Sequence, residues 1–163
     1  MHGYDTFESP LGAVFLCASA RGLTEVRFAR GGRAPACAGR RRTAASPILA
    51  RAKRQLAEYF AGKRRRFDLP LDARGTAFQR AVWRAIASVP YGETISYAEL
   101  ARRAGRPGAA RAAGAAAGRN PIAIIVPCHR IVGSNGRLTG YAAGLARKRA
   151  LLALEAESRG RRP

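Results

Sequence analysis

Two apolar, β-prone runs and one helical periodicity organise the first half of the chain. The runs Gly12–Ala18 and Leu23–Phe28 flank a short polar link and predict a β-hairpin. Ser46-Pro47 combines an N-cap residue with proline at the first helical position, and Gly62 is a typical helix stop. Apolar residues recur at helical spacing between these two signals. The pattern predicts a small sheet carrying one helix, with a boundary near Arg74-Gly75.

The second half has a mainly helical pattern. Thr76 with Gln79 and Ser96 with Glu99 each predict a capping box. The helix after Thr76 carries one apolar face and ends at Pro90, and the helix after Ser96 runs through Ala104. That apolar face consists of Phe78, Val82, Ala85, Ile86 and Val89.

A further predicted helix, Ala109–Ala117, has almost no side-chain bulk. Together with the helix before it, across a turn containing Gly105, it resembles a helix-turn-helix. A bare helix either packs tightly on every side or lets its backbone approach another surface closely. Arg111 is its one long charged side chain, which is either solvated or, opposite DNA, able to contact a base or fill a gap in the stack.

The segment Ile122–Val126 predicts a buried strand that ends at Pro127. Cys128, His129 and Arg130 follow in immediate succession. These three polar side chains do not help a core strand to pack. They would suit a reactive cysteine, because neighbouring cationic groups lower the pKa of a thiol. The alternative is a buried structural cysteine, which is the commoner use of an arbitrary thiol.

A turn at Gly133-Ser134-Asn135-Gly136 and a last helix, Leu145–Glu155, complete the second half. Leu145, Leu151, Leu152 and Ala153 are the buried candidates of that helix. Glu155 is placed either to orient the imidazole of His129 or to serve as an ordinary helix-end carboxylate. Spacing alone favours the second interpretation.

The formal net charge is +20, which favours a polyanionic partner and makes nucleic acid the first candidate. The charge is shared almost evenly between the two halves, so it does not locate a binding face, and a general bias toward arginine contributes. The chain lacks a secretory signal pattern and a membrane-spanning apolar run, which predicts a cytoplasmic protein.

Three widely spaced cysteines, Cys17, Cys37 and Cys128, suggest neither a disulfide framework nor a metal motif. Residues 30–45 lack periodicity and predict a loop, and the basic tail 158–163 predicts disorder.

Several motifs together resemble the methylated-DNA-protein-cysteine methyltransferases, the O-6-alkylguanine-DNA alkyltransferases. The family's active-site signature matches Pro127-Cys128-His129-Arg130 followed by Ile131-Val132. The other matching segments are Phe78–Val89, Pro90–Thr94, Ser96-Tyr97, Ala109–Ala112, Asn120-Pro121, Gly140–Glu155 and, in the more variable first half, Ser9–Gly12.

The resemblance implies an α+β fold. It implies an N-terminal domain, 1–75, with a small ribonuclease H-like sheet and a helix. A mainly helical C-terminal domain, 76–163, would contain a winged-helix-like helix-turn-helix and the active-site cysteine.

The resemblance also implies a suicide transfer of an alkyl group from O-6-alkylguanine, and more weakly from O-4-alkylthymine, to Cys128 after nucleotide flipping. His129 would be the base, acting through a water, Glu155 would hold the imidazole, and Asn120 would order the active-site turn. Tyr97, Tyr141 and Ala142 would line the pocket, Arg111 would fill the vacated stack, and Ala109, Ala110 and Arg130 would complete the DNA-contacting set.

No cofactor is implied, and His2, Cys17 and Cys37 do not form a convincing metal-ligand set. The implied partner is double-stranded DNA, and no membrane is involved. The implied protein is a monomer in solution, with cooperative binding along DNA left open.

Three alternatives come from other classes. A helix-turn-helix regulator would bind DNA without needing Cys128. A non-catalytic damage sensor of the alkyltransferase-like type would lack the acceptor cysteine, which this chain retains. A cysteine hydrolase would turn over, and no oxyanion site is evident in the sequence.

Overall fold

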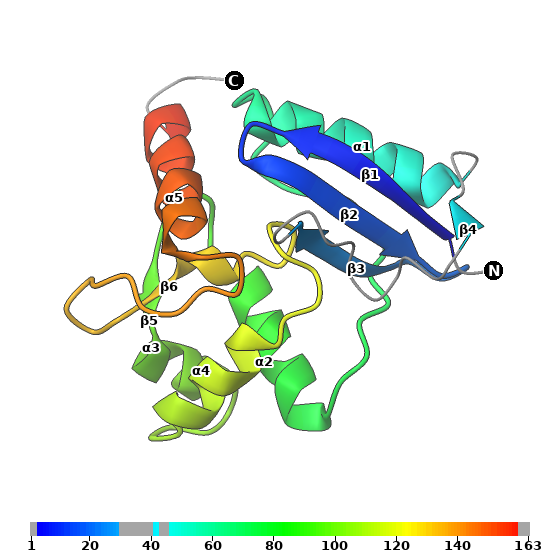
Figure 1. Cartoon of the computed structure of the whole chain (residues 1–163). Coiled ribbons are helices and arrows are strands. Elements are labelled where there is room, and N and C mark those ends of the chain that lie inside the picture. The colour runs from blue at the N-terminus through cyan, green and yellow to red at the C-terminus, as the bar shows by residue number, and fades with distance from the viewer. Residues whose placement is uncertain (1–2, 30–40, 43–45, 160–163) are drawn as a thin grey trace. The chain divides into compact units, whose positions relative to one another are not determined.

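The computed structural model describes residues 3–29, 41–42 and 46–159 (Figure 1). These residues form two compact units. The first contains the described residues up to Ala73 together with Pro121–Ala123, and the second contains Arg74–Asn120 and the residues from Ile124 onward. The return of Pro121–Ala123 to the first unit was not anticipated from the sequence.

The first unit contains a four-stranded sheet in the order β3-β2-β1-β4. The predicted hairpin is confirmed, because β2 (Gly12–Ala18) and β3 (Leu23–Phe28) pair antiparallel at the predicted bounds. β1 (Gly3–Ser9) adds an antiparallel strand to β2, and β4 (Arg41–Arg42) pairs with β1 in parallel. Neither β1 nor β4 was predicted.

β1 escaped prediction because its buried positions are not all apolar. Asp5 is buried in this strand, where its carboxylate accepts a hydrogen bond from the Lys53 ammonium at 2.9 Å. A buried carboxylate is rare unless it is paired in this way. The alternation of apolar and polar residues that marks a half-buried strand is therefore interrupted.

α1 (Pro47–Phe60) lies along one face of this sheet (Figure 1). The predicted cap is confirmed: the Ser46 hydroxyl accepts from the Leu49 amide at 3.3 Å. The helix ends at the C-cap Ala61, followed by Gly62 at a φ of +73°. The buried positions facing the sheet are Leu49, Ala52, Gln55, Leu56 and Tyr59.

Cys17 is fully buried in β2 and takes part in a disulfide bond. The sequence-based expectation of no disulfide is therefore wrong for this residue. Its β2 position left no local signal, because a buried thiol and a buried half-cystine occupy similar apolar surroundings. Most of the predicted loop 30–45 lies outside the described residues, as do residues 160–163 of the predicted tail. Ser158 and Arg159 belong to a helix.

Its described residues give the second unit four α-helices, one 3-10 turn and a pair of two-residue strands. The helices are α2 (Ala77–Ala87), α3 (Tyr97–Arg103), α4 (Ala110–Gly118) and α5 (Leu145–Arg159). β5 (Ile95–Ser96) pairs in parallel with β6 (Ile131–Val132). Among the described residues, no helix is long and apolar enough to cross a membrane.

The two predicted capping boxes have different outcomes. Thr76 and Gln79 form the complete reciprocal box at the start of α2. At the start of α3 only half of it forms: the Ser96 hydroxyl accepts from the Glu99 amide at 3.1 Å. The Glu99 carboxylate instead binds Arg102 and Arg103 on the same helix, so the prediction of a full box there is wrong.

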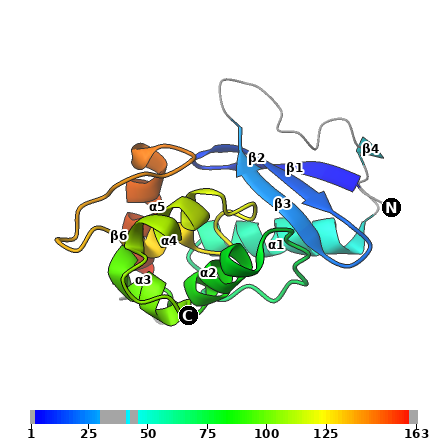
Figure 2. The same ribbon diagram turned by 90° about the horizontal axis from the view of Figure 1, so that it is seen from below.

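The helix pair α3 and α4 is confirmed, and the two helices lie side by side in the second unit (Figure 2). The connecting turn contains Gly105 and Gly108 at φ values of +86° and +85°, which L side chains rarely adopt. α2 also contacts α4, because the Trp83 indole of α2 donates a hydrogen bond to the Ala116 carbonyl of α4 at 2.9 Å.

The small side chains of α4 are packed against the rest of the unit on one face of the helix only. Ala113, Ala116 and Ala117 are buried, whereas Arg111, Ala112 and Ala115 are exposed. The interpretation in which α4 packs on every side is therefore wrong. One face of its backbone is left accessible with little side-chain bulk on it.

α5 corrects the predicted buried set. Leu151 is fully buried and Leu152 is half-buried, but Leu145 is 41% exposed and Ala153 is exposed. The stripe that faces inward is Lys148, Leu151, Glu155 and Ser158. The prediction from hydrophobicity chose the wrong face of the helix, because the buried face carries two charged side chains, Lys148 and Glu155.

Candidate active site

The segment before Cys128 is a tight turn and not the predicted strand. The bridge between Ile122 and Val26 is an isolated one outside the named strands, and Ile124 takes a φ of +71°. A β-branched residue in this left-handed region is strained and persists only where its surroundings hold it. Ile122, Ile124 and Val126 are buried as a strand core would be, which explains why the hydrophobic pattern was misleading.

Asn120 holds this turn closed. The residue is buried, and its side-chain amide donates to the Val126 carbonyl at 2.8 Å. Its amide also hydrogen-bonds the Cys128 thiol. Asn120 therefore connects the end of α4 to the residue at which the candidate chemistry occurs.

Cys128 begins a single 3-10 turn, η2 (Cys128–Arg130), that leads directly into β6. Burial raises the pKa of the Cys128 thiol above its usual value, although the hydrogen bond with Asn120 and the charge of Lys148 act in the opposite direction. The expectation of a thiol activated by its adjacent cationic residues is therefore wrong. The resting group is a protonated thiol that needs a base.

His129 is fully buried, and its Nε2 lies 2.6 Å from Glu155 Oε2. The structure thereby supports the less favoured interpretation of Glu155, which is completely buried on α5. Glu155 comes 26 positions after His129, and α5 brings its carboxylate against the imidazole. The spacing of the two residues in the sequence did not indicate this contact.

Arg130 occupies a different place from the one expected of a DNA-contacting residue. It is buried, and its guanidinium donates to both oxygens of Glu155 at 2.8 and 3.1 Å. A third donor reaches the Val89 carbonyl at 2.7 Å. These contacts make Arg130 a structural partner of Glu155, because they use the planar fork of the guanidinium.

The protonation states follow from these contacts. Burial alone raises the pKa of Glu155, but His129 and Arg130 outweigh it and lower the pKa to about 2. Burial lowers the pKa of His129 more than Glu155 raises it. At neutral pH the pair is thus a carboxylate and a neutral imidazole.

The tautomer of His129 is fixed by the same contacts. Nε2 carries the proton and donates to the carboxylate, which leaves the lone pair on Nδ1. Nδ1 is buried and has no hydrogen-bond partner among the described residues. A neutral imidazole with an unused basic nitrogen, held by a buried carboxylate, is the arrangement that a general base requires.

Two tyrosines and a loop lie in the same unit. The Tyr97 hydroxyl at the start of α3 donates to the Thr139 carbonyl at 3.0 Å. The Tyr141 hydroxyl is buried and has no hydrogen-bond partner in the described part of the chain. Burial and the nearby Cys128 raise the pKa of Tyr141 well above its usual value, so its hydroxyl remains a proton donor. Ala142 follows on the exposed side of the loop.

The predicted DNA-contacting residues of α4 lie at its N-terminal end. Arg111 is exposed, and Ala109 and Ala110 are half-buried. Tyr97 packs against this helix, because a Cβ added at Gly114 would lie 3.4 Å from Tyr97 Cδ1. The Tyr97 ring therefore lies in contact with α4 at Gly114.

Sequence reasoning missed two contributors. The Gly92 amide donates to Glu155 Oε1 at 3.1 Å. The buried ammonium of Lys148 donates to the backbone carbonyls of Ile131 and Thr139. A backbone donor leaves no sequence signal. The lysine had one available signal, because it is three positions before Leu151 and seven before Glu155 on a single helical stripe.

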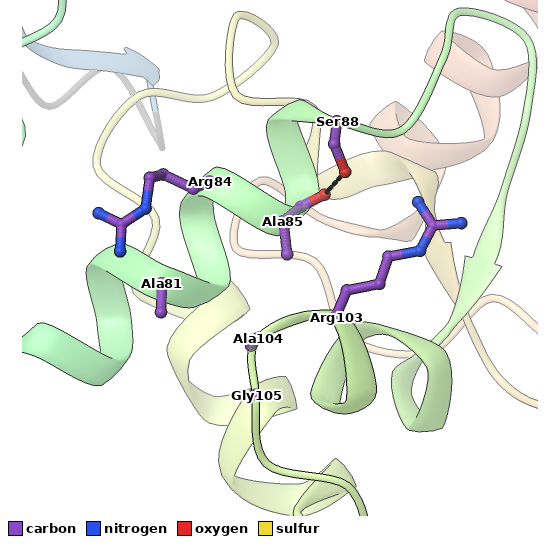
Figure 3. Close-up of a pocket in the computed structure, with 7 residues that line it drawn as sticks. All are labelled: Ala81, Arg84, Ala85, Ser88, Arg103, Ala104 and Gly105. Atoms are coloured by element: carbon purple, nitrogen blue, oxygen red, sulfur yellow. Dashed lines mark hydrogen bonds between the residues drawn. The ribbon is translucent and has the colours of Figure 1, made fainter.

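A separate open groove of about 520 Å³ lies between α2 and the end of α3 (Figure 3). Arg84 and Arg103 flank it, and small residues form its floor. None of the predicted site residues lines this groove. Within the described ranges, no three His, Cys, Asp or Glu residues are grouped to hold a metal ion, and His2 and Cys37 lie outside those ranges.

Comparison with known proteins gives matches over both units. Residues 77–157 match the family described as 6-O-methylguanine DNA methyltransferase, DNA binding domain. Residues 3–73 match its ribonuclease-like domain.

The similarity to known proteins extends over nearly the whole chain. A methylated-DNA--protein-cysteine methyltransferase of Mycolicibacterium paratuberculosis is 51% identical over 152 residues, which cover 93% of this chain and 91% of the relative. One of Methanosarcina acetivorans is 47% identical and covers 93% of this chain and 97% of the relative.

Solved structures agree with these sequence matches. The Mycobacterium tuberculosis O6-methylguanine methyltransferase superposes with a TM-score of 0.90 at 47% identity, covering 100% of this chain and 96% of that one. The M. tuberculosis protein OGT in complex with DNA gives a TM-score of 0.88 at 47% identity, covering 96% and 94%.

Proposed function

Because the chain belongs to the 6-O-methylguanine DNA methyltransferase family and is a methylated-DNA--protein-cysteine methyltransferase, we propose that Cys128 is its methyl acceptor. The observation that carries this assignment is the buried array next to the thiol. It contains a neutral imidazole with a free basic nitrogen, a carboxylate and a guanidinium. The two family matches also fit a division of the chain into domains 1–75 and 76–163.

The reaction proceeds in one displacement. The Cys128 proton passes to His129 Nδ1 through a bridging water, and the sulfur forms a bond with the methyl carbon. The bond between that carbon and O-6 of the guanine breaks, and its electron pair returns to the base. Glu155 stabilises the imidazolium that forms. Guanine then takes up a proton, for which Tyr97 is the donor after its hydroxyl leaves the Thr139 carbonyl.

The product is a thioether, and no described group is positioned to reverse it. Each protein molecule therefore removes one methyl group and is consumed. Larger O-6-alkyl groups, and O-4-alkylthymine more weakly, are further substrates in this proposal. No cofactor is needed, because the thiol itself is the acceptor.

The substrate is double-stranded DNA. An O-6-alkyl group is enclosed within a duplex, so the nucleotide is extruded before the thiol reaches it. The exposed, slim face of α4 lets Ala109 and Ala110 approach the groove, and Arg111 takes the place of the extruded base. Tyr141 and Ala142 line the pocket that receives the base, and Asn120 keeps Cys128 in position.

Mass spectrometry of the unsubstituted chain tests this assignment. Incubation with excess duplex carrying O-6-methylguanine is expected to add one methyl group to the peptide containing Cys128, at one equivalent per protein molecule. A methyl group on another residue, or methyl removal beyond one equivalent, contradicts the proposal. A helix-turn-helix regulator would bind the duplex and leave the mass unchanged.

The Arg111→Ala variant tests extrusion. Since Arg111 compensates for the lost stacking in a duplex only, its removal should weaken binding to matched duplex by roughly tenfold or more, equivalent to over about 1.4 kcal/mol. Binding to a single strand of the same sequence should fall less than about threefold, since no base has to be replaced there.

Arg149→Ala is the matched control, because it removes one exposed positive charge from α5. Fluorescence anisotropy on both DNA forms measures the two ratios. Equal losses on duplex and single strand for Arg111→Ala would show that Arg111 contributes charge alone and would refute its role in extrusion.

A further inference from the structure

The segment Pro90–Thr94 matches the family pattern, but no step of the proposed reaction uses it. In the structure this segment lies between α2 and β5, and we call it the Gly92 turn. Its Glu93 amide donates to the Pro90 carbonyl at 3.1 Å, and Gly92 takes a φ of +78°. L side chains rarely adopt that conformation, so this position of the turn favours glycine.

α5 holds both backbone groups of Gly92. The Gly92 amide donates to Glu155 Oε1 at 3.1 Å, and the Arg159 guanidinium donates to the Gly92 carbonyl at 3.2 Å. Glu155 and Arg159 are four positions apart on α5, so their side chains lie on the same side of the helix. Gly92 is therefore bound through its amide to the carboxylate of the candidate site and through its carbonyl to the end of α5.

The contact between the turn and α5 leaves no room for a side chain at Gly92. A Cβ atom built there would lie 2.8 Å from Arg159 Cδ and 3.4 Å from Cγ. The first distance is shorter than real Cβ atoms show, so the Arg159 side chain would have to shift. An alanine at this position would be strained by its backbone angle and would also displace the group that holds its carbonyl.

The Glu155 carboxylate links this turn to the imidazole. It accepts from the Gly92 amide and from the Arg130 guanidinium, and its Oε2 lies 2.6 Å from His129 Nε2. Arg130 also holds the residue before the turn, because it donates to the Val89 carbonyl at 2.7 Å. A movement of Gly92 would therefore change the hydrogen bonds of the carboxylate that orients His129.

The same turn leads directly to the proposed proton donor. β5 follows it and pairs in parallel with β6, the strand after η2. The Ser96 hydroxyl of β5 caps α3, and Tyr97 is the first residue of that helix. A displaced Gly92 turn would therefore move Tyr97 relative to Cys128 as well as disturb Glu155.

We propose that Gly92 is a positioning residue for methyl transfer: held by Glu155 and Arg159, it keeps the carboxylate behind His129 and the strand leading to Tyr97 in one productive geometry. The inference deepens the proposed function and rests on Cys128 as the acceptor.

Gly92→Ala tests this role, and the chain offers a matched control. Gly136 has a φ of +79°, but a Cβ atom built there would meet nothing within 4 Å. Gly136→Ala therefore introduces the same backbone strain without a contact to α5. The single-turnover rate constant and the amplitude of methyl uptake are measured by mass spectrometry with saturating O-6-methylguanine duplex. Anisotropy on unmodified duplex measures DNA affinity.

We expect Gly92→Ala to lower the transfer rate constant by roughly 30-fold, because the base and the proton donor are both misplaced. Its affinity for unmodified duplex should stay within about threefold, since α4 and Arg111 are untouched. Gly136→Ala should transfer within about twofold of the unsubstituted rate. A merely structural role would lower the amplitude, which reports the folded fraction, and leave the rate constant of the folded molecules unchanged. That result, or an equal fall of the rate constant in Gly136→Ala, would overturn the inference.

Arg159→Ala covers the case in which Gly92→Ala fails to fold, because Arg159 is exposed at the end of α5. Removing the donor to the Gly92 carbonyl should lower the rate constant by roughly fivefold, and with ¹⁵N-labelled histidine the His129 Nε2 resonance should shift. Arg149→Ala, which removes another exposed charge from the same helix, should change neither quantity.

Transfer by Arg159→Ala within about twofold of the unsubstituted rate would overturn the inference, whatever Gly92→Ala shows. Absence of methyl uptake by the unsubstituted chain is a different result. It would refute Cys128 as the acceptor and so remove the premise on which the role of Gly92 rests.

Discussion

Cys128→Ser is expected to lose methyl transfer while retaining affinity for duplex carrying O-6-methylguanine. A serine hydroxyl beside the same imidazole is a far weaker nucleophile toward an alkyl carbon than a thiolate is. We expect the rate constant to fall by at least about 10⁴-fold, which corresponds to over about 5 kcal/mol of barrier. The dissociation constant should change less than about threefold, because the substitution is small and leaves the Asn120 turn intact.

The measurement combines methyl uptake by intact-protein mass with anisotropy on the labelled duplex. Cys128→Ala is the companion variant, and it should match Cys128→Ser in transfer, because neither contains a thiol. Methyl uptake by the serine variant at a comparable rate would remove Cys128 from its role as acceptor. Loss of DNA binding in both variants would show that the thiol contributes to recognition and not only to chemistry.

The second large effect concerns stability. In Glu155→Gln the Arg130 guanidinium stays buried and loses its anionic partner, and the single amide oxygen of glutamine replaces the two carboxylate oxygens that accept from Arg130 and from His129 Nε2. Breaking one side of a buried ion pair costs about 3 to 5 kcal/mol of unfolding free energy. Urea denaturation measures this loss. Glu157→Gln, on the exposed face of the same helix, is the control and should change stability by less than about 0.5 kcal/mol.

The same variant has a distinct pH dependence. The folded pKa of Glu155 is lowered from its ordinary 4.5 to about 2, so its contribution is fully present above pH 4.5 and is lost as the pH falls toward 2. The folded pKa of His129 is lowered from its ordinary 6.5, so its contribution also declines as the pH falls below that value. Both groups therefore make the native protein less stable in acid.

Glu155→Gln removes the carboxylate contribution, so the decline between pH 4.5 and 2 should be smaller in the variant by roughly 2 to 3 kcal/mol. Urea denaturation at a series of pH values compares the two slopes. Parallel curves for the variant and the unsubstituted chain across this window would contradict the charge assignment for Glu155.

Much of the local structure was determined by the sequence. The hairpin of β2 and β3, the Ser46 cap of α1, the Thr76 box of α2 and the pair α3 and α4 all follow from signals within a few residues. The run from Pro127 to Arg130 was likewise sufficient to locate the candidate chemistry. These features depend on backbone geometry and short-range hydrogen bonds, which neighbouring residues control.

The tertiary structure decided what those residues do. Ile122–Val126 has the hydrophobicity of a strand, but the buried amide of Asn120 closes it into a turn with Ile124 in the left-handed region. Arg130 comes two positions after the thiol in sequence, but its side chain is buried against Glu155 of α5, 25 positions later. Neither outcome can be derived from local preference, because each depends on a partner that folding alone brings near.

The thiol illustrates the same division. The sequence by itself singled out Cys128 as the candidate nucleophile, because an imidazole and a guanidinium follow it directly. Adjacent cations suggested a lowered pKa, but folding neutralises Arg130 with Glu155 and leaves His129 uncharged, so burial dominates and raises the pKa of Cys128. Only the tertiary structure decided that activation requires a base, and it placed Lys148 and Glu155, two charged residues on the buried face of α5, near Cys128 and His129. A charge acts through distance and dielectric surroundings, and both are set by the fold.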